Sequence, residues 1–491
     1  VCGSVIATEI SGVTFIGVPG GVLAANGDFT YLLWAIGSLI GRVLVAIFFV
    51  KVYYEEEIYS PYDYMGRRLG HPMKVLATVI FTFGSILAQS VRVLVAALPL
   101  MVVTGLSFEV CIVIIGIFAV MWTLMGGMQT VIWTDVMQFL LFTVGGLLSV
   151  WWISGQVDGG FSHILDIGQA DGKTTLWDDR WGFGKELNFT IWVALLAVPF
   201  LNLTAFGVDQ LNAQRMFCCR DISSARKAII WSSVGQLVTM IMLLVGVALY
   251  VYYKEVPPTG SVADALRFDA EMVPRGAEGT NIVFPVWIVT ELPPGLAGLI
   301  LAGLFAAAIS SLDSILAALS QTSLSLFMRT EHADSEEHGR KLMVASKVLV
   351  VVWGLLLTGF TLALRSAQNH VEILPLAFGM TTYTMGPMLA FMVAALTGRG
   401  NFRGLLIGAV VSIAIAAFWR TDLWIFFKGN MGLMEWLAGT WALEMDASGE
   451  MVQSVYSYVW LWPLTAIITF VFGLVGWAIS QSGKRGESEK V

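Results

Sequence analysis

The stretch 298–323 constrains this chain most, because a membrane-length apolar run carries polar side chains at its centre. It reads GLILAGLFAAAISSLDSILAALSQTS, and about 20 apolar residues suffice for a helix to cross a bilayer. Ser310, Ser311 and Ser314 repeat at helical spacing with Ala307, so the four residues share one face of the helix. Close packing of helices through small hydroxyl residues would explain the serines alone.

Asp313 flanks that face and favours a different interpretation. A carboxylate in the middle of a span costs roughly 2.5–3.5 kcal/mol to insert, so it needs a cation or a hydrogen-bonded partner. Oxygen ligands with one negative charge suit a hard monovalent cation better than a transition metal. The stretch therefore predicts an ion site inside a membrane-spanning helix.

The composition extends this interpretation to the whole chain. Its 491 residues are 57% hydrophobic and 13% charged, whereas soluble domains are about a quarter charged. We therefore expect an all-α, polytopic protein of the cell membrane. Apolar runs separated by polar loops predict twelve spans, which lie near residues 2–24, 29–52, 73–104, 108–125, 129–154, 188–214, 226–253, 296–328, 341–365, 371–398, 402–427 and 453–481.

The placement of basic residues predicts the orientation of these spans. Lys and Arg gather in the short loops that follow alternate spans, and such loops are cytoplasmic by the positive-inside rule. The long loops near 155–187, 254–295 and 428–452 carry fewer basic residues and fall on the other side. The first span then runs outward, and the C-terminus is cytoplasmic.

Other polar residues inside predicted spans are candidates for function. Glu9 lies in a first span that is interrupted by glycines and Pro19, as expected of a discontinuous helix whose freed carbonyls can bind a cation. Asp135 lies in the fifth span and, like Asp313, favours ion binding. Arg42 and Arg92 lie mid-span; for Arg42 we expect structural charge pairing, and for Arg92 a role in solute binding is the alternative to pairing.

Three segments carry a family resemblance that covers nearly the whole chain. They read GGMQTVIWTDVMQ (126–138), DQLNAQR (209–215) and LPPGLAGLILAGLFAAAISSLDS (292–314). Together they resemble the sodium/solute symporter family, which includes the sodium/glucose, sodium/proline and sodium/sialic acid cotransporters. YSPYDYMGRRLG (59–70) and WTDVMQ are most similar to the sialic acid branch.

The resemblance implies a LeuT-type fold, in which five plus five inverted helices form the core and the leading helix of each repeat is broken. We expect this core in residues 1–398, additional C-terminal transmembrane helices in 399–482 and a short cytoplasmic tail in 483–491. The helix that precedes the core in the family, and part of the first core helix, are missing from the chain by this comparison.

The resemblance also implies ion positions. A first Na⁺ would be bound by backbone carbonyls and hydroxyls of Ala7, Ile10, Ala307, Ser310 and Ser311. A second Na⁺, present in some members, would be bound by Asp135, Ser310, Asp313 and Ser314. The sialic acid branch has Ser where this chain has Asp313. Two roles for this extra carboxylate therefore stay open: it strengthens the binding of the second Na⁺, or it carries a proton instead.

The solute positions of the family fall on six residues: Glu9, Ser11, Thr14, Tyr31, Arg92 and Asn202. Asn202 matches a sugar-contacting Asn of the glucose branch. Arg92 lies one turn beyond the Arg that binds the carboxylate in the sialic acid branch. Glu9 stands where that branch has a neutral hydroxyl residue, and a carboxylate beside an anionic solute repels it unless Arg92 or Arg42 compensates.

The expected function is sodium-coupled symport that imports a small polar solute, a sugar or a sugar acid such as sialic acid, by alternating access. An amino acid or a monocarboxylate is the alternative solute; a transporter-like sensor or a passive channel is the alternative class. We expect no enzyme, because no HExxH, GxSxG or P-loop pattern is present. The expected partners are Na⁺, the solute and the lipid bilayer, without nucleic acid or an obligate protein partner.

Overall fold

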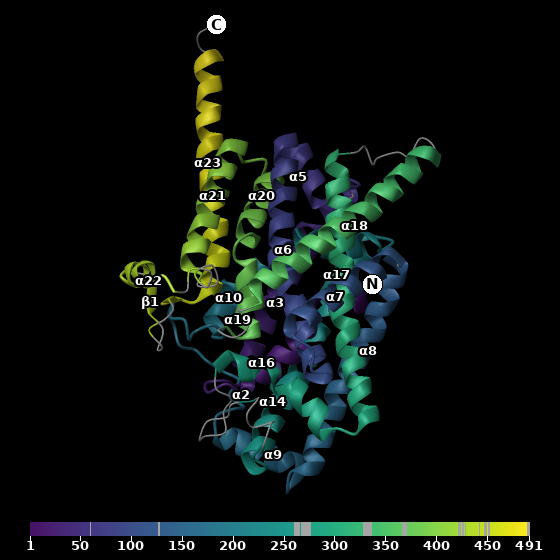
Figure 1. Ribbon diagram of the computed structural model, residues 1–491. Coiled ribbons are helices and arrows are strands. Elements are labelled where there is room, and N and C mark those ends of the chain that lie inside the picture. The colour runs from purple at the N-terminus through teal and green to yellow at the C-terminus, as the bar shows by residue number, and fades with distance from the viewer. Residues whose placement is uncertain are drawn as a thin grey trace. The chain divides into compact units, whose positions relative to one another are not determined.

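The computed structural model is predominantly helical (Figure 1). It describes residues 1–58, 60–125, 128–259, 266, 276–327, 336–365, 371–420, 424, 427, 429–440, 442–445, 449 and 452–488. Within these ranges, the side chains of 128–131, 276–278, 306–308, 310, 336 and 483–488 are outside the description.

The helices form two compact units, and each unit is built from three separate segments. The first consists of Val1–Leu32, Ile86–Asp178 and Trp231–Phe378, and the second of Leu33–Ser85, Asp179–Ile230 and Gly379–Val491. The units therefore interleave along the chain. The predicted division at residues 398 and 482 follows the repeat and not this packing, and it stays a prediction.

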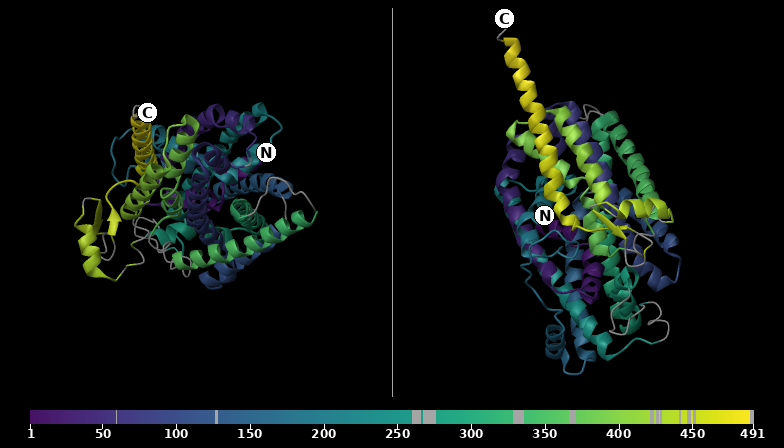
Figure 2. Two further views of the ribbon diagram at one scale, coloured as in Figure 1. Left: turned by 90° about the horizontal axis from the view of Figure 1, so that it is seen from above. Right: turned by 90° about the vertical axis from the view of Figure 1, so that its left-hand side faces the viewer.

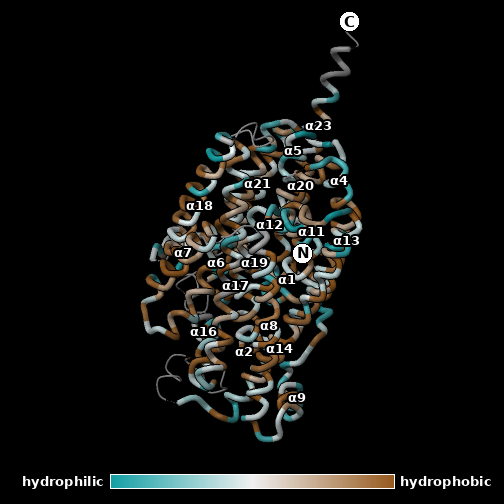
Figure 3. Tube along the Cα trace, turned by 90° about the vertical axis from the view of Figure 1, so that its right-hand side faces the viewer, coloured by the Kyte–Doolittle hydropathy of each residue, from teal (hydrophilic) through white to brown (hydrophobic). Residues whose placement is uncertain are grey.

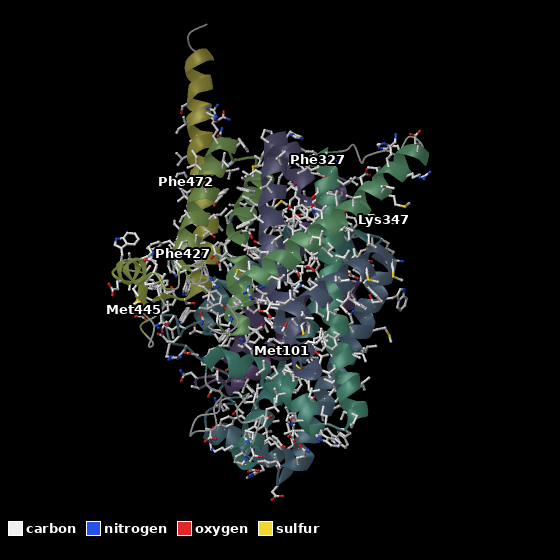
Figure 4. All side chains as sticks on the ribbon, in the orientation of Figure 1. Met101, Phe327, Lys347, Phe427, Met445 and Phe472 are labelled. Carbon is white, nitrogen blue, oxygen red and sulfur yellow. The ribbon has the colours of Figure 1, made fainter. Side chains whose placement is uncertain are left out.

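The elements of the first unit are α1 (Cys2–Glu9), η1 (Val13–Gly17), α2 (Val18–Leu23), η2 (Thr30–Leu33), α7 (Phe108–Met125), α8 (Met128–Gln156), α9 (Gly160–Ala170), η3 (Ser232–Gly235), α14 (Gln236–Glu255), α16 (Gly276–Glu291), α17 (Pro294–Phe327) and α18 (Glu336–Leu364). Two helices are divided between the units, namely α6 (His71–Thr104) and α19 (Ile373–Thr381), and η2 and α13 (Ile222–Trp231) extend into the other unit by one residue each. Hydrophobic residues predominate along α8 and α14 (Figure 3). Phe327, labelled in Figure 4, is the last residue of α17.

The elements of the second unit are α3 (Trp34–Phe48), α4 (Val50–Glu55), α5 (Pro61–Leu69), α10 (Ile191–Leu196), α11 (Val198–Gly207), α12 (Gln210–Phe217), α13 (Ile222–Trp231), α20 (Met385–Thr397), α21 (Phe402–Trp419), α22 (Met431–Ala438), β1 (Leu443–Met445), β2 (Val452–Ser454), η6 (Tyr458–Trp460) and α23 (Leu461–Ser488). Figure 2 shows α23, in yellow, running beside α21. The hydroxyl of Ser412 bonds to Thr469 between these two helices at 2.9 Å.

Each of the twelve predicted spans corresponds to a helix or a bent pair of helices. In the described part of the chain, nine helices are long and apolar enough to cross a membrane, and two bent pairs raise the number to eleven. The remaining predicted span coincides with α17, a continuous helix of 34 residues. In a bilayer, helices satisfy their own backbone polar groups, which is why hydropathy predicts such spans well.

The first span is broken, as predicted. α1 ends at Glu9, the backbone of Ile10 is extended, and the two halves of the span meet at a bend of 51°. Beyond the break, Gly20 packs so closely on Thr280 that an added Cβ would lie 2.3 Å from its carbonyl oxygen. Phe15 joins this span to the core of the first unit, because its ring packs on those of Phe142 and Phe284.

A second break lies in the sixth predicted span, which the resemblance makes the leading helix of the second repeat. The span expected at 188–214 consists of α10 and α11 (together Ile191–Gly207) and of α12, which is bent from them by 55°. Asp209 starts α12, since its side chain accepts a hydrogen bond from the amide of Leu211 at 2.8 Å. An aspartate that bonds its own backbone competes with the helix and ends it. A break at this position agrees with the expectation that the leading helix of each repeat is broken.

The structure also contains two short strands, a small exception to the all-α prediction. In the loop expected at 428–452, α22 is followed by β1 and β2, which pair antiparallel with Leu443 opposite Ser454. Met434, Leu437, Leu443 and Val452 form a small buried cluster beneath them. Apolar residues on the helix and on both strands thus share one local core.

Lys173 forms hydrogen bonds with carbonyl oxygens at the C-terminal end of α2, inside the first unit. Its ammonium donates to the carbonyl oxygens of Val22 at 3.0 Å and Ala24 at 2.7 Å, and lies 4.9 Å from the centre of the Tyr250 ring. Carbonyls at a helix C-terminus lack amide donors and carry the negative end of the helix dipole. Burial lowers the pKa of Lys173, so these contacts offset only part of the cost of desolvating the charge.

Replacing Lys173 with alanine is expected to lower the free energy of unfolding by about 1.5 kcal/mol, the low end for hydrogen bonds to a charged group. The melting temperature of the purified protein measures this change. Lys185→Ala is the matched control, because its pair with Glu444 is exposed and such pairs contribute little. Equal shifts in the two variants would contradict a specific role of Lys173.

Candidate functional site

Three helices of the first unit that carry the predicted ion ligands pack on one another: α1, α8 and α17. Ser4 on α1 donates a hydrogen bond to Asp135 on α8 at 2.5 Å. This bond links the first half of the broken span to α8. The packing therefore brings the broken first span, Asp135 and the polar stretch of α17 into one region.

The break in the first span leaves backbone acceptors in the interior. Ala7 and Ile10 are each only 2% exposed. In the described part of the chain, no backbone amide donates to the carbonyl oxygen of either residue. Buried carbonyls without a donor are costly unless a cation or another group takes the place of the amide.

The hydroxyl of Ser311 on α17 is also buried, at 2% exposure, and is without a hydrogen-bond partner among the described residues. Two other predicted ligands, Ala307 and Ser310, belong to the backbone of α17, but their side chains lie outside the described part of the structure. A buried hydroxyl oxygen is a suitable ligand for a hard cation, and α17, which carries Ser311, packs on α1.

Carboxylates mark the second predicted ion position. Asp135 and Asp313 are both buried, at 0% and 3% exposure. Ser314 donates to Asp313 at 3.1 Å, and Ser4 donates to Asp135. Ser4 was not predicted, because a single serine in an apolar run gives no signal that separates it from a packing residue.

Of the predicted solute residues, Glu9, Ser11 and Thr14 lie together around the helix break. Glu9 accepts a hydrogen bond from the Gln236 side chain at 3.0 Å, and the Ser11 hydroxyl accepts from the amide of Val13 at 3.3 Å. Gln236 begins α14, directly after η3. It was not predicted, although an uncharged polar residue inside the span expected at 226–253 was an available signal.

Two more predicted solute residues belong to the first unit. The ring of Tyr31 packs on Phe378 with centroids 6.3 Å apart, and Arg92 lies within α6. Ser11 and Thr14 are buried, at 3% and 8% exposure. These residues supply hydroxyl groups and one guanidinium, which are the groups that bind sugar hydroxyls and carboxylates.

Asn202 lies in the second unit, and its side-chain amide forms hydrogen bonds with residues of the same unit. Its oxygen accepts from the Ser38 hydroxyl at 2.9 Å, and its nitrogen donates to the carbonyl of Val198 at 3.0 Å. Arg42, also in the second unit, is fully buried with its guanidinium 4.3 Å from the centre of the Phe206 ring. A stacked guanidinium was not predicted for Arg42, because a cation–π partner leaves no trace in the sequence.

Comparison with known proteins places this geometry among transporters. The model of the sodium:solute symporter family matches residues 1–408. The sodium/sialic acid symporter SiaT of Proteus mirabilis is 31% identical over 459 residues, a match that covers 91% of this chain and 88% of that protein. The sodium/sialic acid symporter NanT of Aliivibrio fischeri is 28% identical over 438 residues, covering 88% and 82%.

A solved structure gives the same fold. The substrate-bound, outward-open state of a Na⁺-coupled sialic acid symporter superimposes with a TM-score of 0.75 at 24% identity, covering 97% of this chain and 89% of that one. The similarity confirms the predicted helical fold class of the LeuT type. The five-plus-five division of the repeat stays a prediction.

Proposed function

This chain belongs to the sodium:solute symporter family, and from that premise we propose that it imports a sugar acid such as sialic acid together with Na⁺. It is a multi-pass membrane transporter and not an enzyme, and Na⁺ is its coupling ion. The sugar acid is proposed because two sialic acid symporters resemble the chain over more than four fifths of its length.

The first Na⁺ is proposed to bind at the break in the first span. The ligands would be the carbonyls of Ala7, Ile10 and Ala307 and the hydroxyls of Ser310 and Ser311. The buried oxygen of Ser311, which has no hydrogen-bond partner among the described residues, is the observation that carries this assignment. Neutral oxygens hold Na⁺ without a full counter-charge, so the ion can leave again in each cycle.

A second cation is proposed between α8 and α17, with Asp135, Ser310, Asp313 and Ser314 as ligands. Ser4 would orient Asp135 through its 2.5 Å hydrogen bond. With one Na⁺ an anionic sugar acid crosses without net charge movement, whereas a second ion would move one net charge per cycle, which is worth about 2.3 kcal/mol per 100 mV. A proton carried by Asp313 is the alternative occupant of this position.

The solute is proposed to contact Glu9, Ser11, Thr14, Tyr31, Arg92 and Asn202. Arg92 would neutralise the carboxylate of a sugar acid, and Glu9 would accept from sugar hydroxyls. A neutral sugar is the second candidate, and the Glu9–Gln236 pair favours it, since that pair offers a carboxylate and an amide but no cation.

The orientation is proposed from the positive-inside rule. Basic residues in the short loops and at the end of α23 support a cytoplasmic C-terminus. Solute and Na⁺ would then enter from the face of the long loops near 155–187 and 254–295.

Thermal stability of the purified protein tests the choice of solute. We expect sialic acid to raise the melting temperature in NaCl and not in KCl, because a ligand that binds only the folded state stabilises it by mass action. Glucose, an amino acid and lactate form the comparison panel. A shift with one of these and none with sialic acid would contradict the proposed solute.

Arg92→Gln is expected to weaken binding of the sugar acid about tenfold, since one lost charge-assisted hydrogen bond costs at least ~1.5 kcal/mol and tenfold is 1.4 kcal/mol. Glu9→Gln is expected to act in the opposite direction, because it removes a negative charge near the anion. The ligand concentration at half-maximal thermal shift measures both. The same loss for a neutral sugar in Arg92→Gln would contradict recognition of the carboxylate.

A further inference from the structure

A groove in the first unit lies between α7, α8 and α17. Both α7 and α8 pack on α17, and the space between them has a volume of about 450 Å³. Its walls come from Phe118 and Trp122 on α7, from Trp133, Met137 and Leu141 on α8, and its floor from Ala302, Phe305 and Ile309 on α17, with Thr134 and Gln138 as its polar members. This volume lies in the range of small-ligand sites, roughly 300–1,000 Å³.

The groove is lined for an uncharged, flexible occupant. None of the described residues that line it is charged, and the rings of Phe118 and Trp122 stack with their planes 15° apart. Trp133 and Met137 are 67% and 60% exposed, so its outer wall faces away from the protein. Both α7 and α8 are long and apolar enough to span the membrane, and the medium at such a face is lipid hydrocarbon.

We propose that this groove binds one acyl chain of a bilayer lipid. Because bulk lipid is as apolar as the groove, the preference for the site comes from packing against the aromatic and sulfur-bearing walls and not from the hydrophobic effect. A lipid headgroup does not fit, since the walls offer no charge. A second copy of the protein does not fit either, because a stable interface needs roughly 1,000 Å² or more of buried surface and this is a narrow space between two helices.

The groove adjoins the carboxylates of the proposed second ion position. Ile309 precedes Asp313 by one helical turn, and Thr134 and Gln138 flank Asp135 on α8. Without a lipid, water that enters the groove would bind at its polar members, Thr134 and Gln138; a bound acyl chain displaces this water and so strengthens the attraction of the carboxylates for a cation. This consequence depends on the proposed ion position, whereas binding of the chain does not.

Quenching of tryptophan fluorescence by a phospholipid with brominated acyl chains tests the binding. The detergent-solubilised protein is titrated with this lipid at concentrations that leave most micelles free of it. We expect saturable quenching of Trp122 and Trp133, and Trp133→Phe should remove the part that comes from Trp133. Trp151→Phe is the matched control, because Trp151 is 66% exposed on the same helix but does not line the groove, and it should keep the saturable quenching.

Ala302→Phe fills the floor of the groove and should also abolish the saturable quenching. Equal loss in Trp133→Phe and Trp151→Phe, or saturable quenching that persists in Ala302→Phe, would overturn the proposal. If Trp133 were not quenched by the brominated lipid and the protein had the mass of a dimer, a second copy would be the occupant. This result would also overturn the proposal.

The effect on sodium is measured separately, as the Na⁺ concentration at half-maximal thermal shift. We expect added lipid to lower this concentration several-fold in the wild type. Ala302→Phe should show the lowered value without lipid, because its side chain excludes the same water. An identical lipid effect in both proteins would refute the link to sodium, and the quenching result would still decide whether the groove binds a chain.

Discussion

Ser311→Ala is expected to raise the Na⁺ concentration for half-maximal uptake by about 10–100-fold. The lost contact is a buried oxygen that binds the cation in the proposed site, and contacts to a charge contribute about 1.5–3 kcal/mol, where 1.4 kcal/mol is tenfold. At Na⁺ concentrations that nearly saturate the wild type, uptake by the variant should fall close to background. Solute uptake into proteoliposomes over a Na⁺ titration measures the change.

Ser320→Ala is the matched control for that variant. Ser320 lies on the same helix and is equally buried, but its hydroxyl bonds to the carbonyl of Ser346 on α18 at 2.9 Å. Its loss should lower the melting temperature and leave the sodium dependence unchanged. If Ser320→Ala weakened sodium dependence as much as Ser311→Ala, the effect would be one of helix packing, and the ligand role of Ser311 would fail.

Asp313→Ala is expected to lower the Hill coefficient for Na⁺ toward one. The substitution removes the carboxylate of the second proposed ion position and leaves the oxygens around the break in α1 in place. Solute affinity at saturating Na⁺ should stay nearly unchanged, because Asp313 is not among the proposed solute contacts. A Hill coefficient already near one in the wild type would contradict two sodium ions per cycle.

Asp313→Ala also distinguishes a second coupled Na⁺ from a coupled proton. If Asp313 carries a proton, uptake by the wild type should acidify the vesicle interior without a Na⁺ gradient, and Asp313→Ala should abolish that acidification. If Asp313 binds Na⁺, the acidification should be absent from both proteins. The internal pH of the vesicles distinguishes the two.

The sequence predicted the helical frame well, because a bilayer permits few alternatives. Without water, each spanning segment must satisfy its own backbone, so long apolar runs become helices. Glycines and Pro19 predicted the break after α1. The break before α12 was implied only by the resemblance, since a single capping residue such as Asp209 in an apolar run also fits a buried polar group and does not by itself give the position of a break.

The candidate site was predictable where charge marked it. Asp135 and Asp313 stood out because carboxylates are rare and costly in membrane spans. Ser4 and Gln236 did not stand out, because their role depends on hydrogen bonds to Asp135 and Glu9 that form only in the folded protein. For the same reason the bond from Ser38 to Asn202, which joins residues 164 positions apart, could not be anticipated.

Accumulation of labelled sialic acid in proteoliposomes tests the central claim most directly. Vesicles loaded with KCl are diluted into NaCl or into KCl, and the internal concentration of label is followed with time. We predict transient accumulation above the external concentration in NaCl and only slow equilibration in KCl. Equal uptake in the two salts, or none in either, would contradict sodium-coupled import of this solute.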